Sequence, residues 1–369
     1  MTTSNVIEMT KRNILPITLL LLSASCTDNY IDELQTVAPG PDEEAPTVTV
    51  TYPQQGTLIR VTEDVTPIDI QFTVTDDIEI RDIVVELNGS QIASFDDFAD
   101  YRKALKEHTY EELPNGEHIL SIIATDVSGK STTQTVEFEK VEPYRPVYDG
   151  EIFYMPFDGD NVELVSIRNA NRVGNPGFTS SGRKGSAFAG ATDSYLTLPT
   201  TGLTNPEFSA VMWYKLNATP DRAGILVIGP PDQANPGSAN NRNSGFRFFR
   251  EGSATNQTFK LNVGSGSGES WFDGGAAASV NPSTTSDWIH LAFTISGGRC
   301  VVYINGEVVS ENTFSGVDWT GTDILSIGSG APRFTGWSHL SDLSQIDELR
   351  IFNKELSKEE IQVIIDAES

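Results

Sequence analysis

The sequence predicts an all-β protein made of two successive β-sandwiches. Short runs in which apolar and polar residues alternate, bounded by turn residues, recur from Thr47 to Phe352, and this period is typical of half-buried strands. Helical periodicity is scarce, whereas glycine and proline are frequent, at 31 and 19 residues. A chain of 369 residues also exceeds what one hydrophobic core usually holds. We therefore expect two independent cores.

The charge balance excludes some classes of partner. Aspartate and glutamate number 51 against 25 lysine and arginine residues, a formal net charge of -26. A surface this negative repels phosphate backbones and anionic lipid headgroups. We expect no nucleic-acid partner and no membrane contact through basic patches.

The N-terminal segment is predicted to be an export signal and not part of the fold. In "KRNILPITLLLLSASC", basic residues precede an apolar run that ends in small residues before Cys26. This order is typical of a secretory signal, and the apolar run is too short for a permanent membrane span. Cys26 after small residues resembles the lipobox of bacterial lipoproteins, although Ser23 stands where many lipoboxes carry Leu. The resemblance implies a signal peptide over residues 1–25 and acylation of Cys26; simple cleavage is the alternative.

Residues 26–44 are polar, acidic and aperiodic, so we expect a flexible tether. The remaining cysteine, Cys300, lies within the apolar run "RCVVYI". If Cys26 is acylated no disulfide can form, and Cys300 is predicted to be a small buried hydrophobe.

The first sandwich is predicted over residues 45–142. Asn88-Gly89, Asn115-Gly116 and Ser128-Gly129 mark turns between its alternating strands. The run "LPNGEHILSIIATDVSGKSTTQTVEFE" resembles the last hairpin of bacterial immunoglobulin-like modules, which implies a spacer fold and no particular function. The insertion "SFDDFADYRKALKEHTYEEL" is predicted to be a short helix or structured loop at a sheet edge.

The second domain is predicted over residues 148–369, after the proline-containing segment "EPYRPVYDG". Its ordered stretches are "YMPFDGDN", "SGRKGSAFAGATDSYLTLP", "FSAVMWYKL", "SDWIHLAFTISGGRCVVYINGEVV" and "QIDELRIFNKELSKEEI". Together they resemble the laminin-G-like branch of the concanavalin-A-like lectin and glucanase fold. The resemblance implies a jelly roll of two antiparallel sheets, and it places Trp213, Trp288, His290 and Tyr303 at framework positions.

The resemblance also implies a structural calcium ion where the first and last strands meet. The matching positions are Asp158, the backbone around Gly185, and Asp347, which offer the hard oxygen ligands that calcium prefers. The alternative is an ordinary solvated Asp-Gly turn.

Catalysis is not expected. Enzymes of this fold carry carboxylates that alternate along one strand so that they share a face, and the chain has no "E-x-D-x-x-E". The nearest match, "QIDELR", belongs to the last-strand motif, and nothing resembles the "Q-I-H" of alginate-lyase-type members.

Aromatic and polar side chains gather in the elaborated loops, which predicts a binding surface. The candidate ligand-binding residues are Trp271, Phe272, Trp319, Trp337, His339 and Arg333. Aromatic rings stack on the C–H faces of sugars while polar groups take the hydroxyls. For Trp337 and His339 a purely structural role stays open. Arg242, Arg247, Arg250 and Arg333 would additionally suit a uronic or sulfated glycan.

The order of anchor, tether, immunoglobulin-like spacer and laminin-G-like head resembles surface glycan-binding lipoproteins of polysaccharide-utilisation systems. It implies an outer-membrane, lipid-anchored, surface-exposed protein that captures a polysaccharide, without catalysis, beside an outer-membrane glycan transporter complex. The alternative is an adhesion or matrix protein that binds another protein. A polysaccharide lyase or glycoside hydrolase is the third hypothesis.

Overall fold

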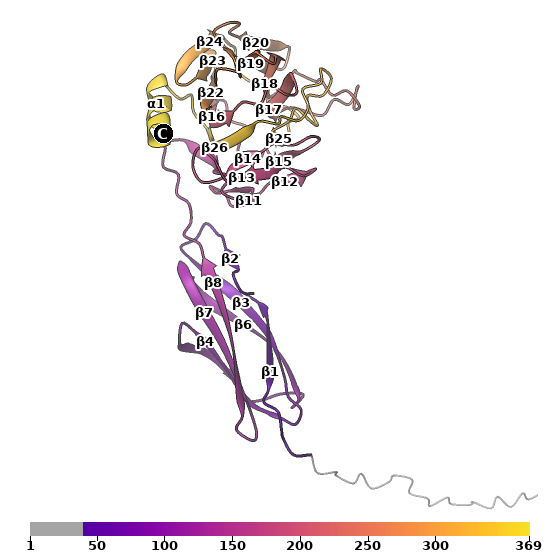
Figure 1. Ribbon diagram of the computed structural model, residues 1–369, viewed down its shortest axis with the longest axis vertical. Helices are drawn as coiled ribbons and strands as arrows, with labels where there is room; N and C mark the ends of the chain where they lie inside the picture. The colour runs from indigo at the N-terminus through magenta and orange to yellow at the C-terminus, as the bar shows by residue number, and fades with distance from the viewer. Residues whose placement is uncertain (1–39, 286) are drawn as a thin grey trace, which may run out of the picture.

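The computed structural model describes residues 40–285 and 287–369, which form two β-sandwiches joined end to end (Figure 1). The predicted signal peptide, Cys26 and most of the predicted tether lie outside the described residues. Among the helices of the described residues, none is long and apolar enough to cross a membrane.

Two sheets form the first sandwich. One has the strand order β1-β3-β6, and the other has the order β2-β8-β7-β4-β5. Their bounds are Thr47–Tyr52 (β1), Leu58–Ile59 (β2), Val65–Thr75 (β3), Ile80–Leu87 (β4), Ser90–Phe95 (β5), Lys103–Pro114 (β6), Gly116–Asp126 (β7) and Ser131–Lys140 (β8). Alternate residues such as Ile70, Phe72 and Val74 face the core between the sheets, because side chains along a strand point to opposite faces.

The predicted helix or loop in the insertion is wrong for its second half. Lys103–Pro114 forms the long strand β6, which pairs with β3 along its whole length. Leu105 does not pack against a sheet edge; it is 68% exposed. Exposed and less exposed positions alternate along most of this segment, and cross-strand bonds such as Thr109 Oγ1 to Asp69 at 2.6 Å favour the sheet over a helix.

The second domain is a jelly roll of two larger sheets. We call the first the loop-covered sheet; it has the order β12-β15-β25-β17-β18-β19-β20, with β21 beside β19. Its strands span Asn171–Val173 (β12), Tyr195–Pro199 (β15), Ile324–Ile327 (β25), Arg222–Ile228 (β17), Phe246–Ser253 (β18), Asn256–Gly264 (β19), Glu269–Asp273 (β20) and Ser279–Val280 (β21).

The opposing sheet has the order β13-β14-β26-β16-β22-β23-β24, with β9 beside β26. Its strands span Gly177–Thr179 (β13), Ala187–Ala189 (β14), Gln345–Phe352 (β26), Phe208–Lys215 (β16), Ile289–Ile295 (β22), Arg299–Ile304 (β23), Glu307–Thr313 (β24) and Glu151–Met155 (β9). A small pair, Val162–Glu163 (β10) and Arg168–Asn169 (β11), lies apart. Helix α1, Lys358–Ala367, packs Ile361 and Ile364 on the outer face of this sheet.

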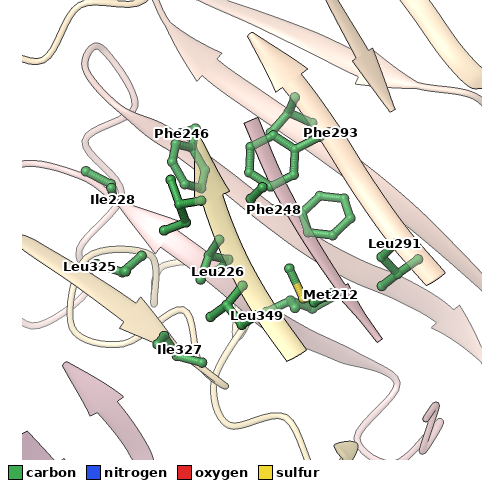
Figure 2. Close-up of a cluster of buried hydrophobic side chains, with 14 of the residues drawn as sticks. Met212, Leu226, Ile228, Phe246, Phe248, Leu291, Phe293, Leu325, Ile327 and Leu349 are labelled. Carbon is green, nitrogen blue, oxygen red and sulfur yellow. The ribbon is translucent and has the colours of Figure 1, made fainter. Parts of the chain in front are cut away.

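The main core fills the space between the two sheets (Figure 2). The rings of Phe246 and Phe248 from the loop-covered sheet each lie 5.0 Å from Phe293 of the opposing sheet. Aromatic contacts at this spacing are favourable beyond the area they bury. The predicted all-β architecture is confirmed.

The two sandwiches meet through a short connection and a few polar contacts. Arg60 of the first domain pairs with Asp160 of the second at 2.7 Å. The chain passes from β8 directly towards β9, so the jelly roll lies at the end of the first domain opposite the point where the described chain begins (Figure 1).

Candidate functional site

The outer face of the loop-covered sheet carries a second, smaller apolar cluster. Val227 of β17 and Phe249 of β18 point outwards and contact Phe334 of the loop between β25 and β26. The ring of Phe334 lies 5.3 Å from Phe249. Because this loop has its own buried anchor, it is held in a defined position over the sheet.

Two tryptophans stack at the edge of this cluster. Trp271 of β20 and Trp337 of the β25–β26 loop have ring centroids 5.6 Å apart and planes 19° from parallel. They remain 38% and 39% exposed. Phe249 meets Trp271 edge-on at 6.1 Å, and Phe334 meets Trp337 edge-on at 5.8 Å. The underlying phenylalanines fix both indoles while leaving part of each ring in solvent.

Arg242, from the loop between β17 and β18, completes this surface. Its guanidinium lies 4.4 Å from the ring centroid of Trp337 and 5.9 Å from that of Trp271, a favourable cation–π geometry. We call Trp271, Trp337 and Arg242 the tryptophan platform. The sequence placed both tryptophans in elaborated loops, but it could not show that they meet.

Glu269 neutralises the charge of Arg242. Arg242 donates to both carboxylate oxygens, with Nη2 to Oε1 at 3.0 Å, and Asn262 Nδ2 donates to Oε2 at 2.9 Å. Burial alone would raise the pKa of Glu269, but the hydrogen bonds from Arg242 and Asn262 hold it below its ordinary value. The platform therefore presents aromatic faces and paired charges.

Two of the predicted ligand-binding residues are buried, which corrects that expectation. Phe272 follows Trp271 on β20, so its ring points to the opposite face and packs in the main core at 1% exposure. His339 is fully buried; it stacks on Phe334 at 4.7 Å and bonds to Glu251 Oε2 at 3.1 Å. Burial lowers the pKa of His339 to about 4. Both side chains support the surface from below.

Trp319 and Arg333 are partly buried and have structural partners, and their place at the ligand surface stays a prediction. Trp319 packs against Phe208 at 5.8 Å and donates its indole N–H to the Asn205 carbonyl at 2.8 Å. Arg333 donates twice to Asp323, at 2.6 Å from Nη2 to each oxygen. Trp319 closes one end of the main core, and the charge of Arg333 is already paired.

The expected arginine cluster for an anionic glycan is not formed. Arg247 is buried and donates to backbone carbonyls, including that of Ser244 at 2.9 Å. Arg250 is buried against Asp342 at 2.8 Å. With Arg242 and Arg333 paired to carboxylates, none of the four offers a free guanidinium to a ligand.

A groove of about 550 Å³ opens beside Trp337. It lies between three loops and is lined by Thr192, Asp193, Thr219, Pro220, Asp221, Arg222, Ser338, Leu340, Ser341 and Leu343. Arg222 Nη1 donates to the carbonyl of Trp337 at 3.1 Å, so a residue of the groove contacts the main chain of the tryptophan platform. This groove could not be predicted from the sequence, because its lining comes from segments far apart in the chain.

The predicted calcium ligands gather around one turn. Asp347 Oδ2 accepts from the N–H groups of Arg183 and Lys184, at 2.6 and 3.0 Å, and Asp158 Oδ1 accepts from Ser186 N–H at 2.9 Å. A Cβ on Gly185 would lie 2.0 Å from Asp158 Oδ1. The donors are hard oxygens, which suit calcium, but in residues 40–285 and 287–369 no three His, Cys, Asp or Glu side chains cluster as a metal site. The calcium ion stays a prediction.

Family models match both domains in the expected order. The bacterial Ig domain model matches residues 46–122, and the model of the concanavalin A-like lectin/glucanases superfamily matches residues 190–362. A search of the curated proteins found no match.

Solved structures show distant similarity. Domain 4 of AbnA, an extracellular arabinanase from Geobacillus stearothermophilus, in complex with arabinotriose, is 20% identical, with a TM-score of 0.43 over 58% of this chain and 99% of that chain. The botulinum neurotoxin serotype C1 binding domain is 16% identical, with a TM-score of 0.44 over 60% of this chain and 52% of that chain. This chain thus spans about half of the toxin domain. Taken with the sheet topology, the family models identify a bacterial Ig domain followed by a concanavalin A-like jelly-roll domain.

Proposed function

We propose that this protein is a non-catalytic carbohydrate-binding protein that captures an extracellular polysaccharide on the tryptophan platform. The observation that carries the proposal is the pair of stacked, half-exposed indoles of Trp271 and Trp337. Exposed tryptophans on a rigid support are costly in water, and they provide flat apolar surfaces that match the C–H faces of sugar rings. The jelly-roll family, which is named for lectins and glucanases, is consistent with a carbohydrate ligand.

The carboxylates around the platform favour binding over hydrolysis. Glycoside hydrolysis needs a general acid, which is a carboxyl group with a raised pKa. Glu269 is paired with Arg242, and Glu251 is paired with Lys260 at 3.0 Å and bonded to His339. Burial alone would raise the pKa of Glu251 and that of Glu269, but these partners lower both. Both groups are held in the ionised form, which cannot donate a proton.

The cell-surface setting is part of the same proposal. Acylation of Cys26 would anchor the chain in the outer membrane, and residues 26–44 would serve as the tether. The Ig domain then acts as a spacer, since the jelly roll lies at its far end from the start of the described chain (Figure 1). A captured polysaccharide would be presented to neighbouring enzymes or to an outer-membrane glycan transporter. Labelling of cells with a palmitate analogue, with and without Cys26→Ala, tests the anchor.

Affinity electrophoresis tests the binding function. The two-domain protein, residues 40–369, migrates through gels that contain algal, plant or microbial polysaccharides, alongside Trp271→Ala and Trp337→Ala variants. Tyr101→Ala, which removes an exposed aromatic ring from the Ig domain, is the matched control. We expect one glycan to retard the parent and the control, and both tryptophan variants to lose at least about tenfold in affinity, about 1.4 kcal/mol.

The other outcomes distinguish the competing functions. Retardation by no glycan would contradict the proposal and favour an adhesion protein that binds another protein. Shortening of the polymer during incubation would contradict the non-catalytic part and indicate a lyase or hydrolase.

A further inference from the structure

We propose that the groove beside Trp337 is a second sugar subsite, and that the platform and the groove together select an uncharged glycan chain. This inference rests on the proposed function, because it names the class of glycan and the path of the chain from the same tryptophan platform. It replaces the preference for uronic or sulfated glycans that the arginine-rich loops suggested.

The groove and the platform are adjacent on the β25–β26 loop. Ser338, which lines the groove, directly follows Trp337, and Arg222 at the groove wall donates to the Trp337 carbonyl at 3.1 Å. Leu340 on the same loop is 41% exposed. Together with Pro220 and Leu343 it adds apolar surface to the groove. A chain that stacks on Trp337 therefore has the groove as its nearest neighbouring surface along this loop.

The lining of the groove has the polar groups that sugar hydroxyls need. A hydroxyl both donates and accepts hydrogen bonds, so it is matched by carboxylates, hydroxyls and guanidinium groups together. The groove offers carboxylates at Asp193 and Asp221, the guanidinium of Arg222, and the hydroxyl-bearing side chains of Thr192 and Thr219. In the described part of the chain, none of the three charged side chains takes part in an ion pair. They keep bonding capacity for a ligand.

The balance of charge disfavours an anionic chain. The groove has two carboxylates against one guanidinium, and the cation of the platform, Arg242, is neutralised by Glu269. The whole protein carries a formal net charge of -26. A sulfated or uronic chain would meet repulsion both at long range and at the groove, whereas neutral hydroxyls would be bound without that cost.

The backbone is also unusual at two residues that line the groove. Asp193 has φ +51° and Ser338 has φ +62°. Side chains other than glycine seldom adopt this left-handed region, and such residues concentrate at ligand-binding sites. Asparagine tolerates this region well, so Asp193→Asn removes the charge with little change to the loop.

Matched pairs of polysaccharides test the selectivity. We would measure retardation of the two-domain protein by polygalacturonate and its methyl ester, dextran sulfate and dextran, laminarin sulfate and laminarin, and carboxymethylcellulose and hydroxyethylcellulose. Within the pair that binds, we expect the uncharged member to bind at least about tenfold more tightly. We also expect its affinity to be insensitive to salt between about 50 and about 300 mM, because no ion pairs are formed. Tighter and salt-sensitive binding of the charged member would overturn the inference.

Variants of the groove test the second subsite. Asp193→Asn, Asp221→Asn and Leu340→Ala should each weaken binding of the uncharged polymer by about three- to tenfold, whereas Asp77→Asn on the Ig domain should not. Gels that contain the charged polymer should measurably retard the Asp221→Lys variant. If the tryptophan variants abolish binding but all groove variants bind as the parent does, the platform binds the glycan and the groove does not. If no polymer binds at all, the proposed function fails and this inference fails with it.

Discussion

Arg250 and Asp342 form a buried ion pair that ties strand β18 to the loop carrying Trp337 and Leu340. Arg250 Nη2 donates to Asp342 Oδ1 at 2.8 Å, and neither side chain is more than 1% exposed. Tyr214 donates its hydroxyl proton to the other oxygen of Asp342, at 2.5 Å, and accepts from Arg250 Nε at 2.9 Å. The surface loop is therefore anchored by a charge network inside the domain.

Breaking this pair should destabilise the jelly roll and weaken glycan binding together. Asp342→Asn leaves the Arg250 charge buried without a counter-charge, so we expect a loss of about 3 kcal/mol in the free energy of unfolding. Asp323→Asn, which breaks the exposed pair with Arg333, is the control and should cost less than about 1 kcal/mol. Urea unfolding and affinity electrophoresis measure the two effects. Equal stability losses in both variants would contradict the anchoring role.

Trp319 should separate stability from binding. Its ring packs on Phe208 and Phe246 at the end of the core, so Trp319→Ala leaves a cavity that costs about 2 to 3 kcal/mol. Because Trp319 is not part of the platform, we expect glycan affinity to stay within about twofold, about 0.4 kcal/mol. A calorimetric scan and a binding curve on the same preparation check this prediction. If the variant loses glycan affinity but not stability, this prediction is wrong and Trp319 binds the ligand.

The regular parts of this fold could be predicted from the sequence, whereas the site could be predicted only in part. Alternating strands and Asn-Gly turns such as Asn305-Gly306 are local features, and their pattern depends on a few neighbouring residues. The stacking of Trp271 on Trp337 depends on how two distant segments meet over Phe249. Exposure follows from the same tertiary detail: Trp271 and Phe272 are adjacent, yet one faces solvent and the other the core.

Strand β6 is a regular element that the sequence did not predict. Phe95, Phe98 and Leu105 with charges between them suggested a short helix or loop, but pairing with β3 decides the conformation of Lys103–Pro114. Strand preference depends strongly on the partner strand, which no local pattern reveals. The buried role of His339 is a related case, because its partner Glu251 lies on another element.

His290 should make the jelly roll less stable in acid. Burial lowers the pKa of His290 to about 3, against an ordinary value of about 6.5 in the unfolded chain. Between these values the unfolded state binds a proton that the folded state does not, so the stability contribution falls as pH falls, by about 1.4 kcal/mol per pH unit. His290→Met should remove this slope. The difference in unfolding free energy between parent and variant, measured from pH 7 down to about 4, isolates His290 from the other titrating groups. A difference that stays constant with pH would refute the predicted contribution of His290.

The calcium prediction is tested by stability. Asp158 and Asp347 bracket the turn of residues 182–186, and we expect millimolar calcium to raise the melting temperature of the jelly roll relative to EDTA, because an ion that binds only the folded state stabilises it. Asp158→Asn should reduce the rise. Magnesium at the same ionic strength is the control, since it demands tighter octahedral geometry. Identical melting temperatures in calcium and in EDTA would contradict the calcium prediction. The hydrogen bonds from backbone N–H groups would then account for the turn on their own.

Glu269 should set the charge preference of the tryptophan platform. Its carboxylate neutralises Arg242, which lies 4.4 Å above the ring centroid of Trp337. Glu269→Gln keeps the size of the side chain and its amide oxygen can still accept from Asn262, but it leaves the guanidinium without a counter-charge. We expect retention by a sulfated polymer to rise severalfold and to become sensitive to salt, as attraction between unpaired charges is screened. Arg242→Met is the reciprocal variant and should show no such gain. If Glu269→Gln leaves the charged polymer unbound while the uncharged one still binds, the pairing of Arg242 does not control selectivity, and the groove carboxylates Asp193 and Asp221 would have to account for it.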